Sequence, residues 1–343
     1  MQSQKPQQIK QCPNFELYNF MQDLRHLIII DTRDITNENQ TFIRGSYLLK
    51  KRSGIKEFIE FVNESVRKGE QFEKKYNSKK IRRAVFYDQL GQLKPENLGE
   101  LEKYANILKQ QDPEFRVYLL KEGYEQFQKK YDFLCLSQED FQKYGQMQQF
   151  QQNENDQKMQ NDKQQQEKTE NDQIREKLLT DVQRKVLFAN AQFPIEIQDS
   201  KLYLGNIYHA NSDMMLKSLG IKTIIDFTHG HQETFKKRME ENLVKNYKYQ
   251  YIPIEKNKMA GVEFDFNEIN EFIDEQLENN NGPVLMFCKD GNSISSNFAI
   301  SYLMYEKGLP FQIASLKVFQ YKGGVIDTCK NIYTQLMTYQ PKK

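Results

Sequence analysis

A glutamine-rich tract in the middle of the chain is the feature that most constrains the fold. Between residues 146 and 173, 11 of 28 residues are Gln, and Asn, Asp, Glu and Lys fill most of the rest. Such a segment cannot bury enough apolar surface to offset the entropy of ordering it. We therefore expect residues 146–173 to be a linker between two folded parts. A helix ordered within a larger assembly is the alternative.

The residues on either side of this tract are numerous enough to form two domains, because the chain has 343 residues. We expect one domain before the tract and a second that begins near Phe193. Just after the tract, apolar residues recur at every fourth position and predict an amphipathic helix that leads into the second domain. They are Ile174, Leu178, Val182 and Val186.

Charge and cysteine content narrow the possible functions. Lys and Arg total 49 against 47 Asp and Glu. The resulting net charge of +2 is too small to attract nucleic acid by itself. The four cysteines form no Cys-x-x-Cys pair and the four histidines show no metal-ligand spacing, so we expect neither a metal nor a cofactor. No apolar run approaches the roughly 18 residues of a membrane span. The N-terminus lacks the apolar core of a secretory signal. We expect a cytoplasmic protein without membrane insertion; a cytoskeletal or ciliary association is an alternative.

The hydrophobic pattern of both halves predicts the α/β class. Short, continuous apolar runs are typical of buried parallel strands, and stripes of period 3.6 between them predict helices. In the first half we expect strands at 27–30, 84–87 and 117–120 and helices at 15–24, 55–66 and 98–108. In the second half we expect strands at 201–204, 223–227, 249–254 and 284–287 and helices at 214–219, 264–277 and 297–305. Alternation of this kind indicates parallel sheets covered by helices.

The segment after the strand at 284–287 carries the strongest chemical signal. The strand runs into Cys288, and a polar loop follows that contains Gly291 and the hydroxyls of Ser293 and Ser295. Backbone N–H groups of such a loop and of the next helix converge on one point and form an anion cradle. The same field can lower the pKa of a cysteine and make it a phosphate nucleophile. A buried cysteine before an ordinary helix is the simpler alternative.

The motifs around this loop resemble a dual-specificity protein phosphatase domain over residues 193–340. They include Phe193-Pro-Ile-Glu-Ile, Lys201-Leu-Tyr-Leu-Gly-Asn, Tyr251-Ile-Pro-Ile-Glu and Ala299-Ile-Ser-Tyr-Leu-Met. The loop of that family reads His-Cys-x-x-Gly-x-Ser/Thr-Arg-Ser/Thr. The matching positions are Cys288, Gly291, Ser293 and Ser295. The resemblance implies that Cys288 occupies the position of the nucleophile.

Three departures from this pattern remove parts of the mechanism. Phe287 replaces the His, Ile294 replaces the phosphate-binding Arg, and Lys256 replaces the general acid. Within the loop, Asp290 adds a carboxylate that would repel a phosphate dianion. Lys289 and Asn292 complete the degenerate loop. The resemblance therefore implies an inactive domain in which Cys288 is a remnant.

Other groups in the second domain could restore part of the mechanism. Glu255 or Asp265 would be the alternative acids, and Lys256 or Lys289 would be the alternative positive charges. A weak dual-specificity phosphatase that uses Cys288 as its nucleophile is therefore the rival hypothesis.

The first half resembles a rhodanese-homology domain over residues 14–135. The resemblance rests on Leu27-Ile-Ile-Ile-Asp-Thr-Arg-Asp, Phe42-Ile-Arg-Gly-Ser and Val117-Tyr-Leu-Leu-Lys-Glu-Gly-Tyr. Active sulfurtransferases of that family have a Cys after the strand that corresponds to residues 84–87. Asp88 stands there in this chain. Because a carboxylate cannot carry a persulfide, we expect no sulfur transfer.

The two domains together resemble the mitogen-activated protein kinase phosphatases, and more closely the serine/threonine/tyrosine-interacting-like pseudophosphatases. The latter family replaces the nucleophile and keeps the arginine, whereas this chain keeps Cys288 and has Ile294. Kinase docking in the former family uses a basic cluster after the Ile-Arg/Lys-Gly strand. The residues at that place are Leu48, Leu49, Lys50, Lys51 and Arg52. The resemblance implies a scaffold that binds protein partners, such as a kinase or phosphoproteins. A purely architectural subunit of a cytoskeletal or ciliary complex is a third hypothesis.

Overall fold

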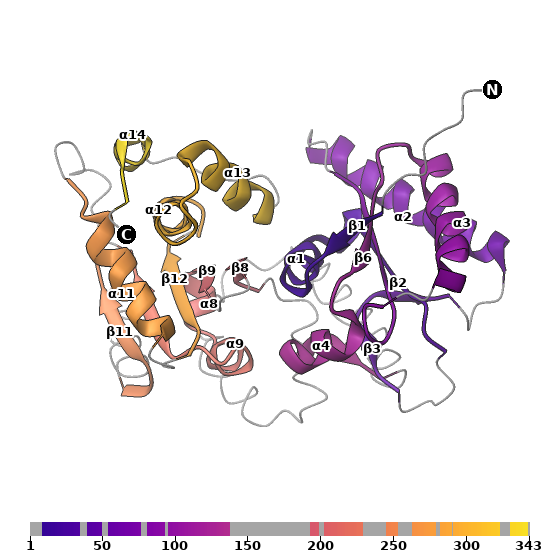
Figure 1. The fold of residues 1–343 in the computed structure, drawn as a ribbon, viewed down its shortest axis with the longest axis horizontal. Coiled ribbons are helices and arrows are strands. Elements are labelled where there is room, and N and C mark those ends of the chain that lie inside the picture. The colour runs from indigo at the N-terminus through magenta and orange to yellow at the C-terminus, as the bar shows by residue number, and fades with distance from the viewer. Residues whose placement is uncertain are drawn as a thin grey trace, which may run out of the picture. The chain divides into compact units, whose positions relative to one another are not determined.

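The computed structural model describes residues 9–34, 40–49, 54–76, 81–92, 95–137, 193–198, 202–228, 245–252, 263–278, 282–289, 291–322 and 330–341. The chain divides into two compact units, the first with Met1–Leu17 and Asp23–Gln192 and the second with Tyr18–Gln22 and Phe193–Lys343. Figure 1 shows the elements of each unit. The linker expected at 146–173 and the helix expected at 174–186 lie outside the described residues.

The first unit is built on a parallel sheet. In spatial order, its strands are β1 (Lys10–Cys12), β6 (Arg116–Leu120), β5 (Arg83–Tyr87), β2 (Leu27–Asp31) and β4 (Ser46–Leu48). A small antiparallel pair, β3 (Phe42–Ile43) and β7 (Cys135–Leu136), forms a second sheet of two strands. The three expected apolar runs form the central strands β2, β5 and β6, where both faces of the sheet are buried. The parallel α/β prediction is thus confirmed.

Helices α2 (Ile55–Tyr76) and α3 (Pro95–Gln111) cover one face of this sheet. The other helices of this part of the chain are α1 (Asn14–Phe20), whose residues from Tyr18 belong to the second unit, and α4 (Gly123–Lys130), with 3-10 turns at Met21–His26 and Asp132–Leu134. Phe58 of α2 and Leu108 of α3 are fully buried against one sheet face, in a core that includes Ile30 and Phe86. The helix expected at 15–24 is shorter than predicted, because the backbone at Asp23 leaves helical geometry.

The second unit has a sheet of order β11-β10-β12-β9-β8, with all neighbours parallel except β8 and β9. Its strands are β8 (Ile195–Gln198), β9 (Leu202–Asn206), β10 (Thr223–Asp226), β11 (Lys248–Tyr251) and β12 (Val284–Cys288). Its helices are α8 (Ile207–Ala210), α9 (Asp213–Ser218), α11 (Phe266–Glu278), α12 (Ile294–Lys307), α13 (Phe311–Tyr321) and α14 (Lys330–Thr338).

Helix α12 forms the centre of the second unit. It is buried from Ile294 to Tyr305, which is typical of a helix inside a core. Its buried residues include four polar ones, Ser295, Ser296, Asn297 and Ser301. Helices α11, α13 and α14 pack against it (Figure 1). Within the described part of the chain, no helix is long and apolar enough to cross a membrane.

Candidate functional site

Cys288 lies at the carboxyl end of the central strand of the second unit. Strand β12 runs between β10 and β9, and Cys288 stands opposite Asn206 in this register. The residue is only 2% exposed. In open parallel sheets, ligand crevices lie at this carboxyl edge. Cys288 thus ends a buried strand, at the edge of the sheet where a ligand crevice would lie.

The hydroxyls that the sequence places in the loop do gather at the sulfur. Ser295 Oγ donates a hydrogen bond to Cys288 Sγ at 3.0 Å, and Ser293 Oγ lies 3.8 Å from the same sulfur. All three residues are buried. The loop thus brings a thiol and two hydroxyls together.

The helix after the loop begins earlier than predicted. We expected it from residue 297, whereas α12 starts at Ile294. The backbone N–H and the side-chain Nδ2 of Asn297 both donate to the Ser293 carbonyl, at 3.3 Å and 2.8 Å. The bond from the Asn297 N–H to the Ser293 carbonyl spans four residues and is therefore the first hydrogen bond of the helix. Ser295 therefore belongs to the first helical turn.

Gly291 sets the shape of the loop. Its φ of 72° is a left-handed conformation, and a Cβ atom there would lie 2.8 Å from the Gly205 carbonyl oxygen. The Gly291 carbonyl accepts hydrogen bonds from Lys322 Nζ and, at 3.2 Å, from Ser296 Oγ. Lys322 Nζ also donates to Ser296 Oγ at 3.0 Å. A cation at the end of α13 therefore helps to hold the loop. No motif in the sequence around Lys322 predicts this contact.

The two departures in the described part of the loop are apolar and buried. Ile294 is 4% exposed and belongs to the main hydrophobic core of the unit. Phe287 is fully buried. The position that holds an arginine in the phosphatase pattern therefore presents no hydrogen-bond donor and packs into the core. Lys289 is exposed and Asn292 is partly exposed.

Of the residues considered for or against a general acid, the structure describes only Asp265. Lys256, Glu255 and Asp290 lie outside the described residues. Asp265 Oδ1 accepts hydrogen bonds from the backbone N–H groups of Asn267 and Glu268, at 3.0 Å and 3.1 Å. Such bonds are typical of a residue that caps a helix, in this case α11. The described residues contain no group of three or more His, Cys, Asp or Glu side chains that could hold a metal ion.

Asp88 stands at the carboxyl end of β5, where the rhodanese resemblance expects a nucleophile. Its carboxylate accepts hydrogen bonds from the backbone N–H groups of Leu90 and Gly91. The carbonyls of Asp88 and Gln89 accept the N–H groups of Tyr124 and Glu125, at 2.9 Å and 3.1 Å. The backbone N–H groups of Leu90, Gly91, Tyr124 and Glu125 are thus already bound within the protein.

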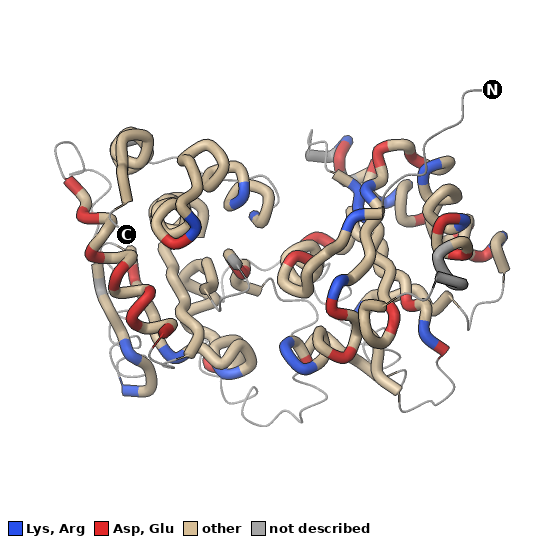
Figure 2. Tube along the Cα trace, in the orientation of Figure 1, with Lys and Arg blue, Asp and Glu red and all other residues tan. Residues whose placement is uncertain are grey.

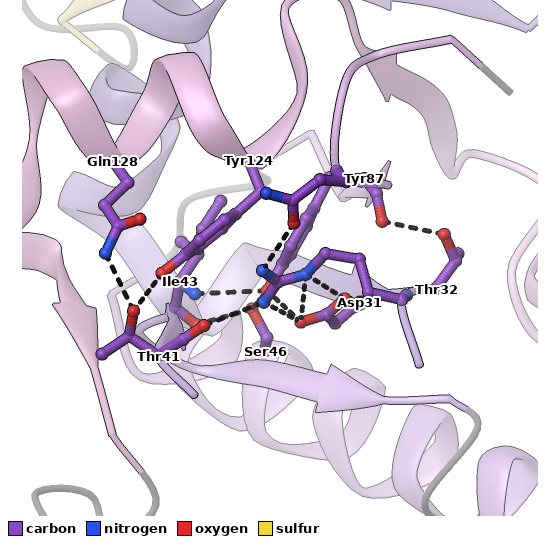
Figure 3. A network of polar contacts seen from close by, with 10 residues as sticks. Asp31, Thr32, Thr41, Ile43, Ser46, Tyr87, Tyr124 and Gln128 are labelled. Carbon is purple, nitrogen blue, oxygen red and sulfur yellow. Dashed lines mark hydrogen bonds and ion pairs between the residues drawn. The ribbon is translucent and has the colours of Figure 1, made fainter. Parts of the chain in front are cut away.

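A buried polar network lies where β2 and β5 end, around Asp31 and Tyr87 (Figure 3). Arg33 binds Asp31 through two nitrogens, with Nη2 at 2.7 Å from Oδ2, and Tyr87 Oη donates to the same oxygen at 2.7 Å. The Arg33 guanidinium lies 3.6 Å from the centre of the Tyr124 ring, and Tyr124 shares a hydrogen bond with Thr41. Burial raises the pKa of Tyr87 well above its usual value, and the charge of Asp31 raises it further.

The expected docking cluster is only partly described. Leu48 ends β4 and is partly exposed, whereas Leu49 is 8% exposed and belongs to the core of the first unit. Lys50, Lys51 and Arg52 lie outside the described residues. Kinase docking through this cluster stays a prediction.

Residues 202–342 match the sequence profile of a known family, "Dual specificity phosphatase, catalytic domain". Human dual specificity protein phosphatase 1 is 36% identical over 111 residues, which are 32% of this chain and 28% of that protein. Rat dual specificity protein phosphatase 5 is 29% identical over 150 residues, which are 43% of this chain and 35% of that protein. The chain thus spans about a third or less of the length of these relatives.

Solved structures give matches of similar extent. The human tyrosine phosphatase-like serine/threonine/tyrosine-interacting protein is 25% identical, with 42% of this chain and 93% of that chain covered and a TM-score of 0.35. A mouse putative dual specificity phosphatase is 18% identical, with coverage of 42% and 84% and a TM-score of 0.35. From the family match, residues 202–342 form a dual specificity phosphatase-like domain.

Proposed function

We propose that this domain has lost phosphatase turnover and that the protein acts by binding, as a pseudophosphatase scaffold in phospho-signalling. The observation that carries the proposal is Ile294. Its side chain is 4% exposed and packs in the core, at the position where the phosphatase pattern has an arginine. A buried isoleucine offers no donor to a phosphate oxygen.

The expected loss of rate is large. An arginine at position 294 would hold two phosphate oxygens by charge-assisted hydrogen bonds of about 1.5–3 kcal/mol each, or roughly 3–6 kcal/mol together. At about 1.4 kcal/mol per factor of ten, this is a loss on the order of 10²–10⁴. Lys256 cannot protonate a leaving oxygen as a carboxylic acid does, and such acid catalysis contributes about 10²–10⁴. The two losses need not multiply.

The first unit also supports a binding role, because it too lacks a reactive group of the family that it resembles. Asp88 replaces the nucleophile of the rhodanese pattern, and its carboxylate binds the N–H groups of its own loop. Neither unit then has a complete reactive site. We propose protein partners, with a mitogen-activated protein kinase docked at Leu48–Arg52 as the first candidate.

One observation favours the rival function, a weak phosphatase. Ser295 donates to Cys288 Sγ at 3.0 Å, so the sulfur keeps a hydrogen-bond donor that a nucleophilic site would use.

Turnover of a fluorogenic aryl phosphate separates the two functions. We expect the wild type and Cys288→Ser to release product at the same background rate. Activity that disappears in Cys288→Ser would overturn the pseudophosphatase proposal. A variant with Ile294→Arg, Lys256→Asp, Phe287→His and Asp290→Ala tests the fold assignment, because it should gain turnover that a further Cys288→Ser change abolishes.

A further inference from the structure

Lys322 ties the loop after β12 to the helix that follows this loop. Its Nζ donates hydrogen bonds to the Gly291 carbonyl, in the loop, and at 3.0 Å to Ser296 Oγ, near the start of α12. Ser296 Oγ donates in turn to the same carbonyl at 3.2 Å. Lys322 follows the last residue of α13, a helix that packs against α12 (Figure 1). Three segments of the second unit thus meet at one ammonium group.

Strand β9 fixes the same glycine by a second contact. A Cβ atom on Gly291 would lie 2.8 Å from the Gly205 carbonyl oxygen and 3.3 Å from Asn206 Cβ, so the two backbones are in close contact. Asn206 is itself held in place, because its side chain accepts hydrogen bonds from two backbone N–H groups of α8, at 3.0 Å and 3.1 Å. The tip of the loop is therefore held both by the end of β9 and by Lys322.

The sulfur of Cys288 is enclosed by the same loop. Cys288 is 2% exposed, and the hydroxyls of Ser295 and Ser293, at 3.0 Å and 3.8 Å from the sulfur, belong to buried residues. A molecule in solution reaches such a group when a local opening of the structure exposes it. Opening of the loop at Gly291 breaks the bond that its carbonyl accepts from Lys322. That bond therefore adds to the free energy of opening.

The charge of Lys322 makes its bonds to the loop strong. Hydrogen bonds from an ammonium group are roughly twice as strong as those between neutral groups. Lys322 is only partly exposed, so water competes less for its donors than at an open surface. The segment 311–322 contains one other lysine, Lys317, and no acidic residue, and Figure 2 shows α13 with blue segments and no red one. Lys317 is partly exposed as well and provides a matched control.

We propose that Lys322 is a positioning residue that latches the loop after β12 and keeps the Cys288 thiol out of reach of molecules in solution. With the latch closed, Gly291 stays against β9 and the sulfur stays buried. With the latch open, Gly291 can leave β9 and the sulfur becomes accessible. This inference rests on the proposed function, because it gives a reason why a chain without turnover can keep an unreactive cysteine at this position.

Alkylation of the full chain by iodoacetamide tests the latch, with the modification of Cys288 followed by mass spectrometry of the peptide that contains it. We expect slow alkylation of Cys288 in the wild type. In Lys322→Met the rate should rise by about tenfold to a hundredfold, as expected for the loss of one charge-assisted hydrogen bond. Lys322→Arg keeps a charged donor and should react close to the wild-type rate, and Lys317→Met should change nothing. Equal rates in the wild type and Lys322→Met would overturn the proposal, as would equal rates in Lys322→Arg and Lys322→Met.

The dependence on urea separates a local latch from a general loss of stability. Local opening exposes little surface, so the rate in Lys322→Met should stay constant up to about 1 M urea, whereas a rate that depends on global unfolding rises with urea. Cys12 and Cys135, both buried in the first unit, should react at the same rate in every variant. A rate for Cys288 in Lys322→Met that rises with urea would contradict the latch. Because alkylation is measured without a phosphate substrate, the latch and the loss of turnover can fail separately.

A change at the other contact of the loop tests the same inference without altering Lys322. Gly291→Ala should also speed the alkylation of Cys288, because the added Cβ would push the loop away from the Gly205 carbonyl. Gly308→Ala is the control, since Gly308 also has a positive φ, 60°, but a Cβ there meets nothing within 4 Å. Equal alkylation of Cys288 in these two variants would refute the role assigned to the position of Gly291.

Discussion

Truncation of Ile294 measures how far this position has become part of the core. The side chain is 4% exposed and packs in the core of the second unit. Ile→Ala changes at such sites cost about 2–5 kcal/mol, from lost burial and the cavity that remains. At roughly 2–4 °C per kcal/mol for a unit of about 150 residues, we expect Ile294→Ala to lower the melting transition of this unit by roughly 4–20 °C.

Ile313 offers a matched control in the same unit. It is also an isoleucine in a helix, but it is 45% exposed on α13. Ile313→Ala should cost no more than about 1 kcal/mol, since surface changes away from special features are small. The chain has no Trp, so calorimetry is the suitable assay, and it can also separate transitions of the two units. Equal shifts for the two variants would show that Ile294 is not a core residue and would remove the main support for lost turnover.

Two further predictions concern the first unit and the pH dependence of stability. Gly91→Ala should destabilise the protein by several kcal/mol in urea unfolding, because Gly91 has φ 71° and its Cβ would lie 2.1 Å from the Lys121 carbonyl oxygen. Gly99→Ala in α3 meets nothing within 4 Å and should stabilise by about 0.5–1 kcal/mol, so a similar loss in both variants would refute the argument. Burial raises the pKa values of Tyr87 and Tyr302 in the folded state. An unfolded tyrosine ionises near pH 10, so the unfolded state releases its protons first and stability should fall as the pH rises above about 10. Melting temperatures measured from pH 8 upward test this prediction, and a Tm that stays constant through pH 11 would contradict it.

Local patterns were sufficient for most of the architecture. A short continuous apolar run such as residues 27–30 favours a buried strand over a helix, because a helix usually extends over more residues, and β2 lies there. The loop after β12 could equally be predicted from sequence, because Cys288, Gly291 and Ser295 are close in sequence and a strand–loop–helix turn brings them together. The start of α12 was harder to predict, since it depends on the bonds that Asn297 makes to the Ser293 carbonyl.

The sequence by itself determined which groups are missing: no arginine at Ile294 and no thiol at Asp88. Only the tertiary structure decided what those positions do instead. Ile294 became part of the core, the carboxylate of Asp88 binds its own loop, and Lys322 reaches Gly291 from 31 residues away. The register of β5 and β6 likewise decided that Arg83 faces Arg116. The physical reason is that residue type sets the chemistry of a position, whereas strand register and helix packing set the neighbours with which that chemistry interacts.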